Sequence, residues 1–158
     1  MAEAVLELGT NLGDRYSNIR KVINAIELLP STRVVKVSDY YETEPFDVPD
    51  KQADYINCCV QIETDLEPET LLGCCLGIEA SMGRIRTFKN SARIIDVDLL
   101  LYEGESRSTK DLTLPHPRML ERGFVLVPLS DIYPEKVALG INFVEKYEIV
   151  DKTGVRHL

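Results

Sequence analysis

The chain has 158 residues and a formal net charge of −8, with 44% hydrophobic and 28% charged residues. This length suits one domain, and the composition excludes a disordered, collagen-like or low-complexity chain. The acidic balance, with a sequence pI near 4.8, argues against nucleic acid or an anionic membrane as a partner. No apolar run approaches the roughly 18 residues of a membrane span, and the acidic N-terminus does not have the pattern of a secretory signal.

The four cysteines form two adjacent pairs, Cys58-Cys59 and Cys74-Cys75. Adjacent cysteines lack the spacing of zinc-binding and redox motifs, so we expect buried, reduced thiols. Together with the lack of an export signal, this pattern predicts a cytoplasmic protein.

The first half of the chain carries strand and helix signals in turn. A strand is expected over residues 4–8, and apolar residues at helical spacing over 16–29 predict a helix that Pro30 ends. Residues 32–43 are rich in β-branched and aromatic side chains, which predicts one long strand. Residues 44–53 hold two prolines and three acidic residues, and a loop of this length inside a domain is usually functional.

A second strand and helix follow this loop. Over residues 55–63 an apolar face alternates with a more polar one, which predicts a strand. Pro68 suits the first turn of a helix whose apolar stripe runs to Met82. A basic loop over 84–92 then leads to a fourth strand, expected over 93–102.

The order of these elements, βαββαβ, is typical of a ferredoxin-like fold. This places the chain in the α+β class, with an antiparallel sheet and helices on one side of it. Residues 103–158 are expected to add a C-terminal extension that contains an apolar stretch from Phe124 to Ile132. No repeat or linker divides the sequence, so residues 1–158 are expected to form a single domain.

The most informative motif is a pair of aspartates in the fourth strand. Side chains alternate across a strand, so Asp96 and Asp98 point to one face, about 6.5–7 Å apart along the chain. The opposite face, which includes Val97 and Leu101, is expected to be core. Two carboxylates on one face repel each other unless a cation lies beside them, and ligation by oxygen alone favours Mg²⁺ over zinc.

A cluster of basic residues lies just before the aspartates in the sequence. Arg84, Arg86, Lys89 and Arg93 fall in a segment, 84–122, that has eight basic and six acidic side chains in an otherwise acidic chain. Carboxylates for a metal and arginines for phosphate oxygens are the parts of a phosphoryl-transfer site. The alternative is that both sets of charges lie solvated on an exposed surface.

Other candidates carry weaker signals. His116, between two prolines, is a candidate hydrogen-bond donor to a phosphate. Arg118 and Arg122 are spaced to converge on an anion from one helical turn. Phe124 and Tyr55 are candidate stacking plates for a planar ring. For each of these residues, a structural or solvated role is the alternative. The remaining histidine, at position 157, is expected in a frayed C-terminus and is discounted.

The chain resembles the hydroxymethyl-dihydropterin pyrophosphokinase family from Leu6 to about Pro134. Five blocks carry the resemblance: 8–14 (LGTNLGD), 41–45 (YETEP), 55–57 (YIN), 83–86 (GRIR) with 93–100 (RIIDVDLL), and 114–119 (LPHPRM) with 122–124 (RGF). The resemblance implies a ferredoxin-like fold and the transfer of pyrophosphate from ATP to the hydroxymethyl group of 6-hydroxymethyl-7,8-dihydropterin in folate biosynthesis. It also implies a monomer whose partners are these two small molecules.

The resemblance assigns a role to individual positions. It implies two Mg²⁺ ions on Asp96 and Asp98, and a catalytic group made of Arg84, Arg93, Asp96 and Asp98. ATP would be held by Arg84, Arg86, Arg93, Thr113, His116, Arg118 and Arg122. The pterin would be held by Thr43, Glu44, Phe46, Tyr55, Asn57, Asp96 and Phe124.

This sequence departs from the family pattern at three places. Thr10 stands where the family usually has serine, and Ala53 follows Gln52 where proline is usual. Many relatives carry Trp-Gly-Pro before the arginine of the metal strand, whereas this chain has Asn90-Ser91-Ala92 and no tryptophan. We expect the loop over 84–92 to close over the triphosphate with altered rigidity, and the reaction class to be unchanged.

Two other functions remain as alternatives to this prediction. One is a different two-metal nucleotide enzyme with the same strand carboxylates. The other is a non-catalytic ferredoxin-like ligand-binding module, although such a module has no use for two aspartates beside a group of arginines. The nucleotide product distinguishes them, because pyrophosphoryl transfer yields AMP and an ordinary kinase yields ADP.

Overall fold

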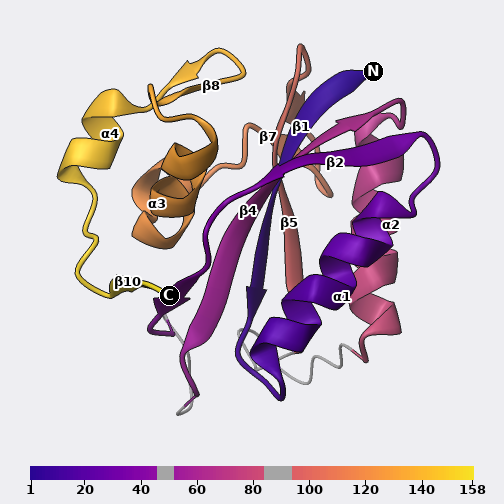
Figure 1. Cartoon of the computed structure of the whole chain (residues 1–158). Helices are drawn as coiled ribbons and strands as arrows, with labels where there is room; N and C mark the ends of the chain where they lie inside the picture. The colour runs from indigo at the N-terminus through magenta and orange to yellow at the C-terminus, as the bar shows by residue number, and fades with distance from the viewer. Residues whose placement is uncertain (46–51, 84–93) are drawn as a thin grey trace.

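The computed structural model of the chain describes residues 1–45, 52–83 and 94–158 (Figure 1). Its main sheet is made of β1 (Ala2–Thr10), β2 (Thr32–Val37), β3 (Tyr41–Thr43), β4 (Tyr55–Thr64), β5 (Asp96–Tyr102) and β10 (Val155–His157). The helices are α1 (Arg15–Glu27), α2 (Pro68–Ser81), the 3₁₀ turn η1 (Met119–Glu121), α3 (Gly123–Ile132) and α4 (Val144–Ile149). Two short hairpins pair β6 (Arg107–Ser108) with β7 (Thr113–Leu114), and β8 (Val137–Ala138) with β9 (Ile141–Asn142).

Within the described residues, the main sheet has the strand order β10-β3-β4-β1-β5, with β2 also paired to β4. Every pair in it is antiparallel. The two central strands, β1 and β4, align from Ala2 opposite Thr64 to Thr10 opposite Ile56. The α+β, ferredoxin-like fold predicted from the sequence is confirmed.

Local signals explain where the two long helices begin. The Asp14 side chain accepts a hydrogen bond of 3.1 Å from the Ser17 amide, which caps α1. Pro68 occupies the first turn of α2, where its missing N–H costs nothing. After α2, Gly83 has a φ of +80°, a conformation that glycine adopts without strain.

The sheet separates two hydrophobic layers. Helices α1 and α2 pack on one face through residues such as Ile19, Val22 and Leu71, together with Leu6 and Leu8 of β1. Helix α3 covers part of the other face in a second cluster, and Figure 1 shows it on the opposite side of the sheet from α1 and α2. The expectation of helices on one side of the sheet therefore holds only for the βαββαβ unit, because the C-terminal extension adds a helical layer on the other face.

Two expected strand features are wrong in detail. The strand expected over 32–43 is broken between β2 and β3, where Ser38 Oγ accepts a hydrogen bond of 2.9 Å from the Cys59 amide. In β5 a bulge lies between Leu99 and Leu101, which pair with Leu6 and Val5. The bulge turns Leu101 into the α3 layer, away from the layer that holds Val97 and Leu99.

The cysteines and the C-terminus complete the comparison with expectation. All four cysteines are free thiols, and three are buried, with Cys74 partly exposed. Burial raises the pKa of the Cys75 thiol to about 12, so this side chain stays protonated. The expectation of a frayed C-terminus is wrong, because residues 155–157 form β10 and His157 Nε2 lies 2.9 Å from Asp39 Oδ2.

Candidate functional site

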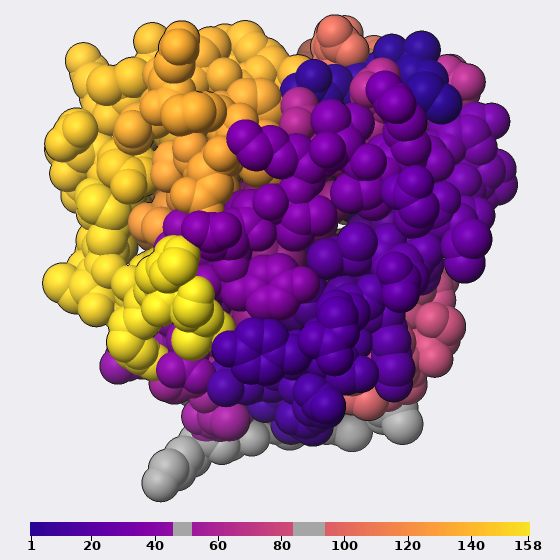
Figure 2. Space-filling view, viewed as in Figure 1, coloured from indigo at the N-terminus to yellow at the C-terminus, as the bar shows by residue number. Residues whose placement is uncertain are grey.

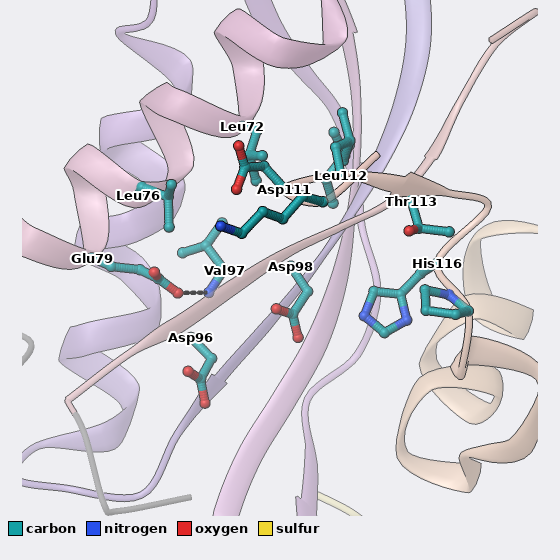
Figure 3. Close-up of a pocket in the computed structure, with 13 residues that line it drawn as sticks. Leu72, Leu76, Glu79, Asp96, Val97, Asp98, Asp111, Leu112, Thr113 and His116 are labelled. Carbon is teal, nitrogen blue, oxygen red and sulfur yellow. Dashed lines mark hydrogen bonds between the residues drawn. The ribbon is translucent and has the colours of Figure 1, made fainter. Parts of the chain in front are cut away.

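Asp96 and Asp98 lie in β5, the edge strand of the sheet. Figure 3 shows both carboxylates on the same side of the strand, away from α2, as the alternation predicts. Val97 between them is 4% exposed and packs in the core. Asp96 is opposite Gly9 of β1, and Asp98 is opposite Glu7.

A wall of α2 side chains borders the same strand. Leu72, Leu76 and Glu79 line a cavity of about 360 Å³ together with Asp96 and Asp98 (Figure 3). The three helix residues were not singled out from the sequence. Their spacing of four and three residues was the available signal, because it places them on one helical face.

Glu79 connects α2 directly to β5, the strand that carries the two aspartates. Its side chain is 3% exposed, and its Oε2 accepts a hydrogen bond of 2.8 Å from the Val97 amide. An edge strand directs alternate amides away from the sheet, and a buried amide without a partner is costly. Glu79 therefore holds the backbone of β5 between the two aspartates.

The other side of the cavity comes from the segment around β7. Lys110, Asp111, Thr113 and His116 line it, with Asp111 and Thr113 exposed and His116 partly buried. In Figure 3, His116 lies across β5 from Glu79. A cavity bordered by a helix, an edge strand and this polar segment has the form of a small-molecule site.

His116 is held as a neutral hydrogen-bond donor. Burial lowers the pKa of its imidazole, and the positive charges of Arg122 and Arg118 lower it further. Its Nδ1 accepts a hydrogen bond of 3.3 Å from the Arg118 amide. This arrangement leaves Nε2 as the protonated nitrogen, ready to donate to an anionic oxygen.

Arg122 joins the His116 side of the site to Phe124. The guanidinium carbon of Arg122 lies 5.4 Å from the centre of the Phe124 ring. Burial lowers the pKa of Arg122 from its usual value, and the charge of Arg118 adds to the effect. Arg118 and Arg122 lie at the two ends of η1, and both line the cavity that Phe124 borders.

A buried acid not singled out from the sequence lies on β1, opposite Asp98. Glu7 is 3% exposed, and its Oε1 accepts a hydrogen bond of 3.0 Å from the Cys59 thiol. Burial raises its pKa well above the usual value, and the negative charge of Asp98 adds to this rise. An acidic residue inside an otherwise apolar strand was the sequence signal for it.

The predicted pterin residues meet at the ends of β3 and β4. Asn57 is buried, and its Nδ2 donates a hydrogen bond of 2.6 Å to Thr43 Oγ1. Thr43 pairs with Tyr55, a partly exposed aromatic residue. A Cβ on Gly9 would lie 2.7 Å from Asn57 Oδ1, so glycine is required beside this amide.

Phe124 borders a second cavity, of about 320 Å³. Thr43, Glu44, Arg118 and Arg122 also line it. The structure thus brings three of the predicted pterin residues, Thr43, Glu44 and Phe124, to one cavity with two of the predicted ATP-binding arginines. The remaining predicted residues, Phe46, Arg84, Arg86 and Arg93, lie outside the described residues, as does the loop over 84–92.

The donor set at β5 fits a magnesium site that is completed by its substrate. Among the described residues, no group of three or more His, Cys, Asp or Glu side chains is placed to hold a metal ion. Asp96 and Asp98 are a pair of oxygen ligands on one side of the strand. Mg²⁺ is commonly held by one or two carboxylates, with substrate phosphates and water as its other ligands.

Comparison with known proteins gives a family match over most of the chain. Residues 5–134 match the family model described as 7,8-dihydro-6-hydroxymethylpterin-pyrophosphokinase (HPPK). The chain is 39% identical over 158 residues to the 2-amino-4-hydroxy-6-hydroxymethyldihydropteridine pyrophosphokinase of Methylorubrum extorquens, which covers 100% of this chain and 99% of the relative. The Bacillus subtilis enzyme of the same name is 41% identical over 129 residues, which is 82% of this chain and 77% of the relative.

Solved structures show the same fold. A Plasmodium falciparum HPPK-DHPS wild-type structure with SDX-DHP matches 94% of this chain, with a TM-score of 0.66 and 17% identity. A structure described as HPPK-DHPS in complex with substrates matches 93% of it, with a TM-score of 0.68 and 16% identity. This chain spans 43% of each of these longer proteins. In the described part of this chain, no helix has the length and apolar character needed to cross a membrane.

Proposed function

Since the chain belongs to the 7,8-dihydro-6-hydroxymethylpterin-pyrophosphokinase family, we propose that its reaction takes place beside Asp96 and Asp98 at the β5 edge. The protein is an ATP-dependent pyrophosphokinase of folate biosynthesis, which converts ATP and 6-hydroxymethyl-7,8-dihydropterin into AMP and the pterin pyrophosphate. The pterin hydroxyl oxygen bonds to the β-phosphorus of ATP and loses its proton. The bond from that phosphorus to the oxygen shared with the α-phosphorus breaks, and AMP leaves with that oxygen.

One observation supports this location above the others. The two aspartates line the cavity of about 360 Å³, and Asp96 lies across Gly9 of β1 from Asn57, which is bonded to Thr43. An in-line transfer needs its two substrates on either side of the groups that neutralise the phosphates. The β5 edge is where this chain offers that arrangement.

We propose that Asp96 and Asp98 would hold two magnesium ions. When bound, Mg²⁺ neutralises the charge that develops on the transferred phosphates. The role of this chain is to keep the two carboxylates at fixed spacing. Glu79 contributes to this by binding the Val97 amide between them.

Basic side chains of both cavities would orient ATP. His116 lines the cavity beside β5 and donates from Nε2, while Arg118 and Arg122 line the cavity beside Phe124 and provide charged donors that match phosphate oxygens. Thr113 lines the cavity beside β5, where it would border the adenine. We assign Arg84, Arg86 and Arg93 to the triphosphate from the family resemblance alone.

The pterin ring would be held by aromatic faces and a few polar groups. Tyr55 and Phe124 are the candidate stacking residues, and Asn57 and Thr43 offer hydrogen bonds to the edge of the ring. Glu44 lines the adjoining cavity, and Phe46 is included from the family resemblance. Asn57 is buried and bonded to Thr43, so its amide is oriented before the ring arrives.

We also propose that residues 1–158 act as one domain, as a monomer and in the cytoplasm. The four free thiols support a reducing compartment. The two hydrophobic layers share one sheet, which supports a single folding unit.

The test is an incubation with ATP, Mg²⁺ and 6-hydroxymethyl-7,8-dihydropterin, followed by identification of both products. We expect AMP and the pterin pyrophosphate in equal amounts, and formation of both roughly 10³-fold slower with Asp98→Asn. Formation of ADP would contradict pyrophosphoryl transfer. Full turnover by the Asp98→Asn variant would contradict the location of the site.

A further inference from the structure

The last strand of the sheet lies beyond residues 5–134, the range that the family model matches. Strand β10 pairs with β3, with Val155 opposite Thr43 and Arg156 opposite Glu42. In Figure 2 the yellow C-terminal residues lie directly against the purple surface of the sheet. The end of the chain therefore contacts the strand that carries Thr43, a predicted pterin residue.

Arg156 binds two acidic residues that directly precede pterin candidates. Its Nη2 donates hydrogen bonds to Glu42 Oε1 at 3.2 Å and to Asp54 Oδ2 at 2.8 Å. Glu42 is next to Thr43, and Asp54 is next to Tyr55. One guanidinium thus connects the end of β3 to the start of β4.

Arg15 of α1 binds the same two residues from another direction. Its Nη1 donates to Glu42 Oε2 at 2.8 Å and to the Asp54 carbonyl oxygen at 3.0 Å. The hydrogen bonds from Arg15, and then those from Arg156, lower the pKa of the Glu42 carboxyl. Two arginines from opposite ends of the chain therefore fix the distance between the same two positions.

The turn before β10 forms part of the cavity beside Phe124. Asp151, Thr153 and Gly154 line that cavity together with Thr43 and Glu44, which lie far earlier in the sequence. Asp151 Oδ1 accepts hydrogen bonds from the Thr153 amide at 3.0 Å and from its hydroxyl at 2.7 Å, which stiffen the turn. A Cβ on Gly123 would lie 2.3 Å from the Asp151 carbonyl oxygen, so the turn rests directly on the start of α3.

We propose that the C-terminal segment 151–157 is part of the pterin site, with Arg156 as a positioning residue that connects β10 to the paired ends of β3 and β4, next to Thr43 and Tyr55. The turn closes the cavity beside Phe124, and β10 extends the sheet along β3. This inference rests on the proposed placement of the pterin. Exposed ion pairs add little to stability, whereas a small misplacement of a binding group weakens binding. We therefore expect Arg156 to affect the affinity for the pterin more than the stability of the fold.

The test compares Arg156→Ala with Arg33→Ala. Arg33 is a matched control because its Nη2 lies 2.7 Å from Glu63 Oε1 in a cross-strand pair of the same sheet, between β2 and β4. For Arg156→Ala we expect the KM for the pterin to rise about fivefold to tenfold, with kcat and the KM for ATP within about twofold of wild type. Arg33→Ala is expected to change none of these constants. The melting temperatures of both variants should fall by a similar, small amount.

A second readout measures binding without turnover. The Kd of 6-hydroxymethylpterin, the oxidised ring, is measured by fluorescence titration in the presence of a non-hydrolysable ATP analogue. We expect the same rise for Arg156→Ala and a partial return for Arg156→Lys, which keeps the charge but loses the guanidinium whose Nη2 donates to both carboxylates. A double variant with Glu42→Gln is expected to be less than additive, because both changes remove one connection.

The outcomes separate this inference from the proposed site. If Arg156→Ala and Arg33→Ala give equal pterin constants, or if the KM for ATP rises with that for the pterin, the positioning role is wrong. If Asn57→Ala leaves the pterin KM unchanged, the placement of the pterin is wrong. A large effect of Asn57→Ala together with no effect of Arg156→Ala overturns the role of the C-terminal segment alone.

Discussion

The two edges of the main sheet are held by different kinds of contact. At the β5 edge, the groups that matter lie at alternate positions of one strand, and a buried carboxylate on α2 binds the strand amide between them. At the β3–β10 edge, partly exposed side chains from distant parts of the chain connect strand ends. Burial makes the first edge rigid, whereas the second depends on the correct docking of the C-terminus.

This difference matches the needs of the two substrates. A triphosphate with metal ions requires charges at fixed positions, and a buried strand supplies them. A planar ring requires two facing surfaces that admit it, and the residues that we propose for the pterin are spread over β3, β4 and the start of α3. Variants at the two edges should therefore change different kinetic constants.

Asp98→Asn is expected to give the largest effect. It removes one charged oxygen ligand at the β5 edge, so we expect kcat to fall by roughly 10³-fold, which is about 4 kcal/mol of transition-state stabilisation. The affinity for the pterin alone should change by less than about twofold. Product formation at saturating Mg²⁺ measures the first quantity and fluorescence titration the second.

Asp111→Asn is the control for this variant, because Asp111 lines the same cavity but is exposed. We expect it to keep near-normal turnover. Equal losses in the two variants would mean that the general negative charge of the cavity matters, and the special role of β5 would be lost.

Gly123→Ala tests the docked C-terminus at the other edge. The added Cβ meets the Asp151 carbonyl oxygen at 2.3 Å, and a backbone atom cannot move aside cheaply. We expect a loss of about 1–3 kcal/mol in the free energy of unfolding, measured by chemical denaturation. Gly73→Ala is the control, since a Cβ there meets no atom within 4 Å in α2 and should stabilise the helix by up to about 1 kcal/mol. A neutral Gly123→Ala would mean that the 151–154 turn is not held against α3.

Phe124→Leu separates the pterin from the nucleotide. Leucine keeps apolar volume and loses the ring face, so we expect the KM for the pterin to rise about tenfold, equivalent to about 1.4 kcal/mol. The KM for ATP should stay within about twofold of wild type. Steady-state kinetics with each substrate varied in turn measure both values, and a rise confined to ATP would place the ring elsewhere.

The sequence predicted the β5 edge well because its signals are local. Alternation in a strand places Asp96 and Asp98 on one face regardless of the remaining fold, and the apolar partners of that strand identify it as core. Glu79 was missed because its role depends on an edge-strand amide that only the assembled sheet exposes. Leu101 was placed on the wrong face because a bulge reverses the alternation. No residue type in that strand predicts a bulge.

The other edge was predicted less completely because its contacts connect distant residues. Tyr55 was a candidate stacking residue from the sequence, whereas Thr43 and Asn57 were identified from the family resemblance alone, and these two do meet in the structure. The contributions of Arg156 and His157 could not be predicted, since a terminal strand of three residues carries no periodic signal. This strand pairs with β3, and its side chains contact Asp39 and Glu42, which lie more than 100 positions earlier.

The smallest expected effect concerns the proton balance of nucleotide binding at the β5 edge. Burial and two nearby arginines hold the pKa of His116 below its ordinary value in the free protein. Phosphate oxygens beside Nε2 would raise that pKa, so the binding of ATP in mildly acidic solution should be accompanied by proton uptake at this residue. Isothermal titration calorimetry in buffers of different ionisation enthalpy measures this uptake. His116→Asn serves as the reference, because ATP itself exchanges protons in both proteins and the difference belongs to the imidazole. The same lowered pKa means that protonation of His116 opposes folding, so the stability of the wild type relative to this variant should fall as the pH drops below about 6.5. Identical proton counts for the two proteins would show that His116 does not meet the phosphates, and the nucleotide side of the comparison would then rest on the arginines and the aspartates.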